Sequence, residues 1–136
     1  MFKLYRQIIK QYPKLSLHHE RKLIRLAKKG NTSALQTLLL HQVGYFVFRI
    51  RTVLYPSVVK EFGEDILQEC LLWTPQKIRS YNLRYRNKKG IFQPVLLRSY
   101  IWKGITGVIF QYVRKNNIEI AVGSTITSTQ VETGLD

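Results

Sequence analysis

Apolar residues recur three and four positions apart along most of this chain, the spacing that places them on one side of an α-helix. Glycine, proline and polar stretches divide the pattern into predicted helices over residues 2–11, 17–29, 31–54, 63–73 and 93–115. Ser16 precedes the second helix and Asn31 or Thr32 the third, and these residue types are typical N-caps. Gly30 between them is a typical helix stop. We therefore expect an all-α fold, a compact bundle of about four to five helices.

Two segments depart from the simple amphipathic pattern. Pro75 follows the fourth predicted helix, and proline removes a backbone hydrogen bond and clashes with the preceding turn. Either the helix kinks there, or Thr74 caps a new helix with Pro75 in its first position. Residues 116–136 are β-branched and polar and contain no cation, which predicts an irregular C-terminal tail. The chain then divides into a basic N-terminal helix at 1–14, a helical body at 15–115 and this tail.

The predicted helix at 63–73 has two unlike sides. Its core side carries Ile66, Leu67, Cys70, Leu71 and Trp73. The opposite side carries what we call the acidic face, which consists of Asp65, Gln68, Glu69 and Leu72. Three of the eight acids in the chain lie in this helix, whereas no acid occurs from Cys70 to Ile118. A small acidic surface surrounded by cations repels nucleic acid locally, so we expect it to meet a basic protein surface.

The last predicted helix also has two sides. One is a stripe expected to face the core, formed by Leu97, Ile101, Gly104, Ile105, Val108 and Tyr112. The other carries Ser99, Trp102, Lys103, Thr106 and Phe110. Large rings beside a lysine are costly to leave in water, which indicates that this side meets a partner. The alternative is that Trp102 packs against another helix at the flank of the stripe.

The basic loop, residues 82–90, lies between these two helices. It carries Arg84, Tyr85, Arg86, Lys88 and Lys89. The cations suit phosphates and the tyrosine ring suits the face of a base, so the loop is typical of a nucleic-acid contact. An ordinary solvated loop is the alternative interpretation.

Composition narrows the choice of partner. The formal net charge of +14 points first to nucleic acid and second to an anionic membrane surface. The aromatic fraction of 12% argues against a disordered basic tail. Cys70 is the only cysteine, which fits a reducing cytosol. No secretory signal is visible, and no apolar run reaches the roughly 20 residues of a membrane span, so we expect a cytoplasmic, nucleoid-associated protein.

The residue pattern does not favour catalysis or metal binding. Paired carboxylates beside a base, a nucleophile motif and a phosphate-cradling glycine loop are all missing, so we expect neither an enzyme nor a cofactor. His18, His19 and Glu20 are adjacent, whereas a metal site on one helix face needs a spacing of three or four. We expect these three residues to form a solvated face.

Three stretches, taken in order, resemble region 2 of the sigma-70 family of bacterial RNA polymerase sigma factors. LSLHHERKLIRLAKKGNTSALQTLLLHQ is similar to a family stretch of two helices joined by a Gly-Asp turn, which reads Gly30-Asn31 here, with Ala34 and Leu38 at small and apolar positions. EDILQECL resembles the family signature Asp-Leu-hydrophobic-Gln-Glu-Gly. FQPVLLRSYIWKGITGVIFQYVRK is similar to the aromatic helix that reads the promoter −10 element. The resemblance covers about residues 15–115 and implies the fold of sigma domain 2.

The resemblance implies two partners. Asp65, Gln68 and Glu69 match positions that dock on the clamp helices of the large catalytic subunit of core RNA polymerase. Tyr100 matches an aromatic position at the upstream edge of the melted promoter, and Lys103 and Thr106 match positions that face the −12 base pair. Members of the family capture flipped-out bases of the non-template strand in pockets.

These implications combine with the residue pattern into two expected sites. The polymerase-binding residues are Asp65, Gln68, Glu69 and Leu72. The expected contacts to promoter DNA are Arg84, Tyr85, Arg86, Lys88, Lys89, Arg98, Ser99, Tyr100, Trp102, Lys103, Thr106 and Phe110.

The chain also departs from the family pattern. Paired tryptophans of the family read Ser99-Tyr100 here, and Cys70 replaces a glycine. Residues 116–136 leave no room for the helix-turn-helix that reads the −35 element. This implies a second small chain that carries it, a weak factor acting at −10 alone, or a competitor that occupies the clamp.

Two alternative functions therefore stay open. One is a regulator that binds the polymerase clamp and excludes the resident sigma factor without reading DNA. The other is a generic basic helical protein that binds DNA or RNA.

Overall fold

The computed structural model describes residues 2–92, 95–116 and 118, and these residues form helices without a β-strand. This described part of the chain contains six helices: α1 (Lys3–Gln11), α2 (Leu17–Lys28), α3 (Thr32–Leu40), α4 (Val43–Val53), α5 (Pro56–Arg79) and α6 (Leu97–Lys115). The expected all-α bundle is confirmed. Most of the tail expected at 116–136, namely residue 117 and residues 119–136, and the expected first turn at Gln93 and Pro94 lie outside the described residues.

The predicted helix ends at 16–31 are confirmed. The Ser16 hydroxyl accepts a hydrogen bond from the backbone N–H of His19 at 3.3 Å, and the Asn31 side chain accepts one from Ala34 at 3.0 Å. Each bond satisfies a backbone donor that the first turn of a helix leaves free. Gly30 adopts a φ of 96°, a left-handed conformation that glycine tolerates better than other residues, and so ends the preceding helix.

The single helix predicted over 31–54 is wrong, because the chain turns at His41 and Gln42 between α3 and α4. The turn is held from outside, since the His41 ring lies 2.7 Å from the Pro13 carbonyl oxygen. The apolar pattern continues through both helices and hides the break.

Of the two alternatives at Pro75, the new helix capped by Thr74 does not form. Helix α5 continues through Pro75 to Arg79 and begins at Pro56, well before Gly63. Thr74 does not cap a second helix: it is buried, and its hydroxyl donates to the Cys70 carbonyl at 2.7 Å. A long helix tolerates the missing proline N–H here because the segment is packed against its neighbours on both sides of the proline.

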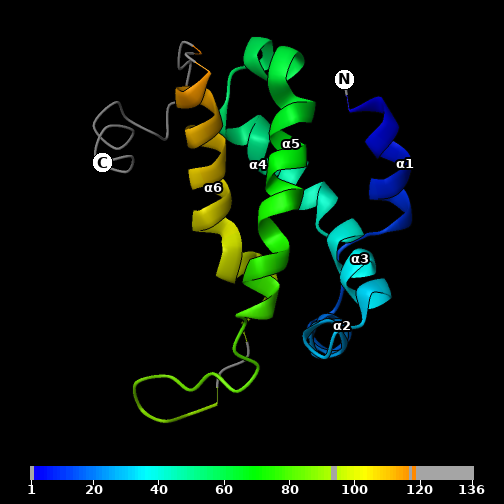
Figure 1. Cartoon of the computed structure of the whole chain (residues 1–136), viewed down its shortest axis with the longest axis vertical. Helices are drawn as coiled ribbons and strands as arrows, with labels where there is room; N and C mark the ends of the chain where they lie inside the picture. Colours follow the sequence, from blue (N-terminus) through cyan, green and yellow to red (C-terminus); the bar gives the residue numbers. More distant parts are fainter. Residues whose placement is uncertain (1, 93–94, 117, 119–136) are drawn as a thin grey trace.

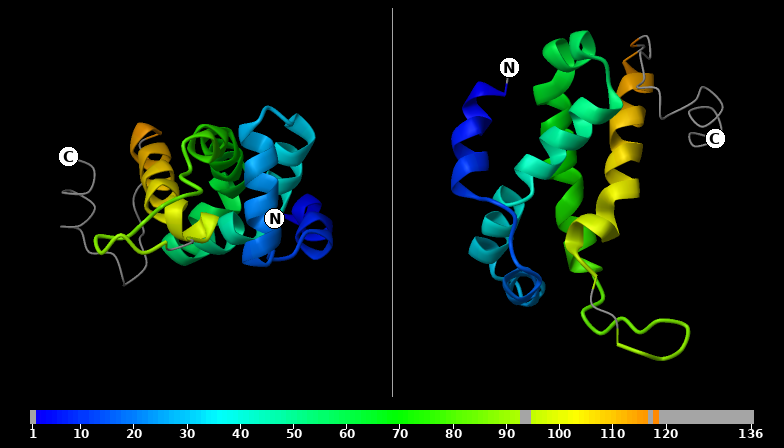
Figure 2. Two further views of the ribbon diagram at one scale, coloured as in Figure 1. Left: turned by 90° about the horizontal axis from the view of Figure 1, so that it is seen from below. Right: turned by 180° about the vertical axis from the view of Figure 1, so that it is seen from behind.

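Helices α4, α5 and α6 form the centre of the bundle, with α5 in contact with both of the others (Figure 1). Helix α1 packs on α4, while the paired α2 and α3 contact α5 towards its C-terminal end (Figure 2). The core contains fully buried side chains from all three central helices, including Phe46, Ile50, Ile66, Leu67, Ile101 and Ile105. Burying each of these side chains stabilises the fold by about 1.5–3 kcal/mol.

Helix α6 begins where a distant acid satisfies its first backbone donor. The Glu20 carboxylate, on α2, accepts a hydrogen bond from the Leu97 backbone N–H at 2.6 Å. Glu20 is 4% exposed, so the solvated face predicted for it is wrong, whereas His18 and His19 are exposed as expected. Burial raises the pKa of Glu20 above its ordinary 4.5, against the opposite effects of the Leu97 N–H, Arg98 and Lys14. This contact fixes the α6 N-terminus relative to α2.

None of the described helices combines the length and apolar character needed to cross a lipid bilayer.

Candidate nucleic-acid and protein interfaces

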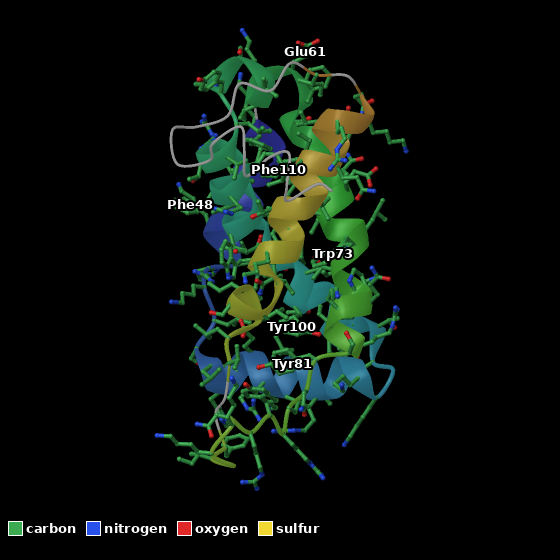
Figure 3. The ribbon with its side chains drawn as sticks, turned by 90° about the vertical axis from the view of Figure 1, so that its left-hand side faces the viewer. Phe48, Glu61, Trp73, Tyr81, Tyr100 and Phe110 are labelled. Carbon is green, nitrogen blue, oxygen red and sulfur yellow. The ribbon has the colours of Figure 1, made fainter. Side chains whose placement is uncertain are left out.

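A hollow of about 490 Å³ lies where α5 ends and α6 begins. We call it the aromatic hollow, and it is lined by Tyr81, Asn82, Tyr85, Val95, Ser99, Tyr100, Trp102 and Lys103. Five of the residues expected to contact DNA are therefore brought together, one from the basic loop and four from α6. Tyr81 and Tyr100 lie at the same end of the molecule, far from Glu61 at the start of α5 (Figure 3).

The rings of the hollow are held in place but not covered. Tyr81 is buried, its hydroxyl donates to the Val95 carbonyl, and its ring meets that of Tyr100 edge-on with centroids 5.3 Å apart. The Tyr100 hydroxyl lies 3.2 Å from the Ser80 hydroxyl. Tyr85, Tyr100 and Trp102 nevertheless keep 44%, 40% and 42% of their surfaces exposed. Rings that are both positioned and accessible can stack on the faces of unpaired bases.

Trp102 is oriented by a contact with α4. The Arg49 guanidinium lies over the indole at 5.4 Å, and its Nε donates to the Thr106 hydroxyl at 3.1 Å. Thr106 in turn donates to the Trp102 carbonyl at 2.9 Å. The alternative prediction, that Trp102 packs against another helix, holds only in part. Arg49 of α4 contacts the ring, but the ring stays partly exposed. The guanidinium adds a cation beside the hollow.

The basic loop has an ordered turn at its tip. The Asn87 side-chain oxygen accepts from the backbone N–H groups of Lys89 at 2.9 Å and Ile91 at 3.0 Å. Gly90 has a φ of 76°, and the Arg86 guanidinium donates to its carbonyl at 3.1 Å. Arg84, Lys88 and Lys89 are exposed. Their backbone positions are thus set by local hydrogen bonds while their charges remain available.

Cations on α2 hold the base of this loop. Arg21 donates to the Leu83 carbonyl at 2.6 Å and lies over the Phe92 ring at 5.3 Å. The Lys28 ammonium donates to the carbonyls of Arg79 at 2.9 Å and Tyr81 at 2.5 Å. Charge-assisted bonds to backbone carbonyls are stronger than neutral ones, so α2 fixes the N-terminal end of the loop, and the Arg21 guanidinium also contacts the Phe92 ring that follows its C-terminal end.

Seven of the twelve expected DNA contacts lie outside the hollow: four belong to the basic loop, and three, Arg98, Thr106 and Phe110, belong to α6. Arg98 is partly buried with its guanidinium 5.2 Å from the Tyr45 ring, and Thr106 is occupied by Arg49. Phe110 is only 7% exposed and belongs to the core, so the prediction that it meets a partner is wrong. Its place in the helical repeat was read as solvent-facing, but the apolar surface of α6 is wider than the predicted stripe.

The acidic face is exposed along α5. Asp65, Gln68 and Glu69 are all exposed, and Leu72 keeps 76% of its surface accessible. Asp65 accepts a hydrogen bond from the Tyr112 hydroxyl of α6 at 3.3 Å. Burial and the neighbouring Asp65 carboxylate raise the pKa of Tyr112, so this hydroxyl stays a donor at neutral pH.

The opposite side of α5, over the same residues, is apolar. Cys70 is fully buried, and burial followed by the charge of Glu69 raises its pKa to about 12. A thiol that stays protonated is a weak nucleophile, so Cys70 serves packing.

A groove between α5 and α6 borders the acidic face. It comprises two hollows of about 620 and 530 Å³ that share Trp73, Val108, Gln111 and Lys115. Trp73 lies against Gly104, where an added Cβ would overlap the indole, and the Lys77 ammonium lies over the Trp73 ring at 5.6 Å. The helical spacing of residues 63–73 predicted only a core position for Trp73. In the sequence, Gly104 is the residue that could have indicated the groove, because its lack of a side chain leaves room for the Trp73 ring.

Among the described residues, no group of three or more His, Cys, Asp or Glu side chains is arranged to hold a metal ion. Comparisons with protein-family models, curated proteins and solved structures found no match.

Proposed function

We propose that this chain is a transcription initiation factor, or a subunit of one, of the sigma-70 kind. In this proposal the acidic face docks on the clamp helices of core RNA polymerase. The aromatic hollow takes unpaired bases of the non-template strand in the promoter −10 region, and the basic loop holds the adjoining phosphates.

The observation that supports this proposal most is the composition of the aromatic hollow. Its four rings, Tyr81, Tyr85, Tyr100 and Trp102, line it together with a lysine and polar side chains, and three of the rings are partly exposed. Stacking on such rings contributes about 1–3 kcal/mol per base and needs a base that has left its duplex. A generic phosphate-binding surface needs cations but no positioned rings.

The separation of the two surfaces is the second support. The acidic face occupies the middle of α5, from Asp65 to Leu72, whereas Tyr81 follows the C-terminal end of that helix and lies with Tyr100 far from Glu61 (Figure 3). A protein partner on the acidic face therefore leaves the hollow open. Simultaneous binding of polymerase and a single strand is what an initiation factor requires.

The test is tryptophan fluorescence in a Trp73→Phe background, which leaves Trp102 as the only indole of the chain. A single-stranded −10 oligonucleotide is expected to quench this fluorescence, and Tyr100→Ala is expected to weaken the titration by about 5- to 150-fold, the equivalent of one stacked base. Tyr55→Ala is the matched control, because Tyr55 is an exposed tyrosine outside the hollow. Equal quenching in wild type and Tyr100→Ala contradicts the proposal.

Polymerase pull-down and DNA titrations of the same protein distinguish the two alternative functions. A clamp-binding regulator that does not read DNA retains core polymerase in a pull-down but shows no quenching. A generic binder shows no preference between the two strands and a steep salt dependence.

A further inference from the structure

The exposed side of α2 carries a straight line of cationic and titratable residues. His18, Lys22, Arg25 and Lys29 are spaced by four, three and four positions, so they lie on one face of the helix, and all four are exposed. The opposite face holds Ile24 and the capping Glu20 in the core. We call these four residues the α2 stripe. At 1.5 Å per residue the stripe is roughly 16 Å long.

No described acid offsets the stripe. Of the five acids among the described residues, Glu20 is buried, and the other four, Glu61, Glu64, Asp65 and Glu69, lie on α5 between residues 61 and 69. The end of the molecule formed by α2 therefore presents charge of one sign. Such a surface concentrates anions and steers them towards it.

The stripe and the basic loop belong to one body. Arg21 and Lys28, on the flank of α2, bind the carbonyls of Leu83, Arg79 and Tyr81, as described above. Helix α2 crosses the end of the bundle next to the loop (Figure 3). Lys22, Arg25 and Lys29 thus extend the cationic surface of Arg84, Arg86, Lys88 and Lys89 without a hinge between them.

The form of the stripe favours a duplex backbone. It has no aromatic ring beyond the imidazole of His18, so it offers nothing on which successive bases could stack. Its length matches about five phosphates along one strand of a duplex, at about 3.4 Å per phosphate along the axis. A helix that lies in a membrane interface instead shows a broad exposed apolar face, whereas α2 packs Leu23, Ile24 and Ala27 against the core and has only Leu26 among the exposed large apolar side chains of the described residues.

We infer that the α2 stripe binds the phosphate backbone of duplex DNA that adjoins the single strand held in the aromatic hollow. The inference rests on the proposed function for the location of the single strand. It adds a second, sequence-independent contact, which fixes the junction between duplex and unpaired DNA relative to the hollow.

The test measures binding of two labelled DNAs by fluorescence anisotropy over a range of salt concentrations. One is a single-stranded oligonucleotide of about ten nucleotides, and the other is the same strand extended by a hairpin duplex. The variant is Lys22→Gln with Arg25→Gln. Its matched control is Lys60→Gln with Lys115→Gln, which removes the same charge from exposed positions at the opposite end of the bundle.

For the α2 variant we expect the salt slope of junction binding to fall by about 1.8, since each lost phosphate contact removes about 0.9. Binding of the single strand is expected to stay within twofold of wild type, and the control is expected to keep the wild-type slope on both DNAs. Thermal unfolding of both variants verifies that they are folded.

Three results overturn the inference: equal losses in variant and control, equal losses on the two DNAs, or no change on either. If the α2 variant instead loses binding to vesicles containing phosphatidylserine while junction binding is unchanged, the stripe is a membrane contact. Failure of the proposed function gives a different result from failure of this inference: Tyr100→Ala then does not weaken binding of the single strand.

Discussion

The aromatic hollow and the acidic face are built in different ways, although both depend on α5. All four residues of the acidic face lie within two turns of one helix, from Asp65 to Leu72. The hollow instead depends on contacts that cross long stretches of sequence. Lys28 reaches Tyr81 over 53 positions, and Glu20 reaches Leu97 over 77 positions. The acidic face is therefore sensitive mainly to its own residues, whereas the hollow can be disturbed from α2.

The difference also separates the two chemistries. The acidic face has two carboxylates and an exposed leucine, which suits a basic protein surface. The hollow has rings and a lysine, which suit unpaired bases and phosphates. Variants at one surface should therefore leave binding at the other surface intact.

The largest effect is expected for Glu69→Lys on polymerase binding. Breaking an interfacial charge pair costs about 2–5 kcal/mol, which corresponds to a loss of roughly 30- to several thousand-fold in affinity. Glu61→Lys makes the same charge change at an exposed position of α5 outside the acidic face and should bind nearly as well as wild type. A pull-down of core polymerase measures the expected loss, and fluorescence anisotropy with a single-stranded oligonucleotide measures whether DNA binding is retained. Unchanged polymerase retention by Glu69→Lys would show that the acidic face is not the docking surface.

Arg21→Gln should weaken single-strand binding without contacting the strand. The Arg21 guanidinium holds the Leu83 carbonyl, and hydrogen bonds from charged groups contribute about 1.5–3 kcal/mol. Its loss should loosen the basic loop, raise hydrogen exchange at residues 83–91 and lower single-strand affinity, while polymerase retention stays unchanged. Arg25→Gln on the exposed side of α2 is the control for charge alone. Wild-type exchange in the loop of Arg21→Gln would contradict the anchoring.

Glu20 should make stability pH-dependent through the α6 N-terminus. Burial raises the pKa of Glu20 in the folded state, so the folded state holds the proton more tightly than the unfolded chain. The stability that protonated Glu20 contributes is fully present below the pKa of Glu20 in the unfolded chain. It is lost as pH rises through the raised pKa of the folded state. The free energy of unfolding of wild type relative to Glu20→Gln should therefore decrease with rising pH from about 4.5 upward.

Glu20→Ala distinguishes the cap from the charge. It leaves the Leu97 N–H without its acceptor and should cost about 1–3 kcal/mol at every pH, whereas glutamine keeps an acceptor oxygen. Urea unfolding at several pH values measures both variants. A wild-type minus Glu20→Gln difference that rises with pH would reverse the expected sign.

The smallest effect is expected for Gly104→Ala in the groove. Alanine improves helix propensity by about 1 kcal/mol, and overpacking against Trp73 costs about 1–3 kcal/mol, so the net change in stability should be within about 2 kcal/mol. The new Cβ must displace the partly buried Trp73 ring, which should shift its emission to longer wavelength in a Trp102→Phe background. Gly107→Ala, where a Cβ meets nothing within 4 Å, should leave the emission unchanged.

Local signals in the sequence were enough to predict much of the molecule. The periodicity of residues 63–73 placed Asp65, Gln68, Glu69 and Leu72 together on an exposed face, because one helix fixes their geometry. The caps at Ser16 and Asn31 were predicted for the same reason. Ser99, Tyr100, Trp102 and Lys103 of the hollow were also predicted, since they share one helical segment.

The remaining features depend on tertiary contacts that periodicity does not encode. The local sequence around Glu20 predicts a surface acid, because the Leu97 backbone N–H that it accepts from lies 77 positions further along the chain. Phe110 lies outside the predicted stripe but is buried in the core. The turn at His41 and Gln42 is hidden by apolar residues on both sides, and Pro75 looks like a break that packing and Thr74 override.

The most direct measurement compares wild-type affinity for a single-stranded oligonucleotide with its affinity for an abasic strand of the same length and charge. If the aromatic hollow binds bases, removal of the bases should weaken binding by about 1–3 kcal/mol for each stacked base, and Tyr100→Ala should bind the two strands more nearly alike. If wild type binds the abasic strand as tightly as the natural one, phosphates alone account for binding and the hollow is not a base-binding site.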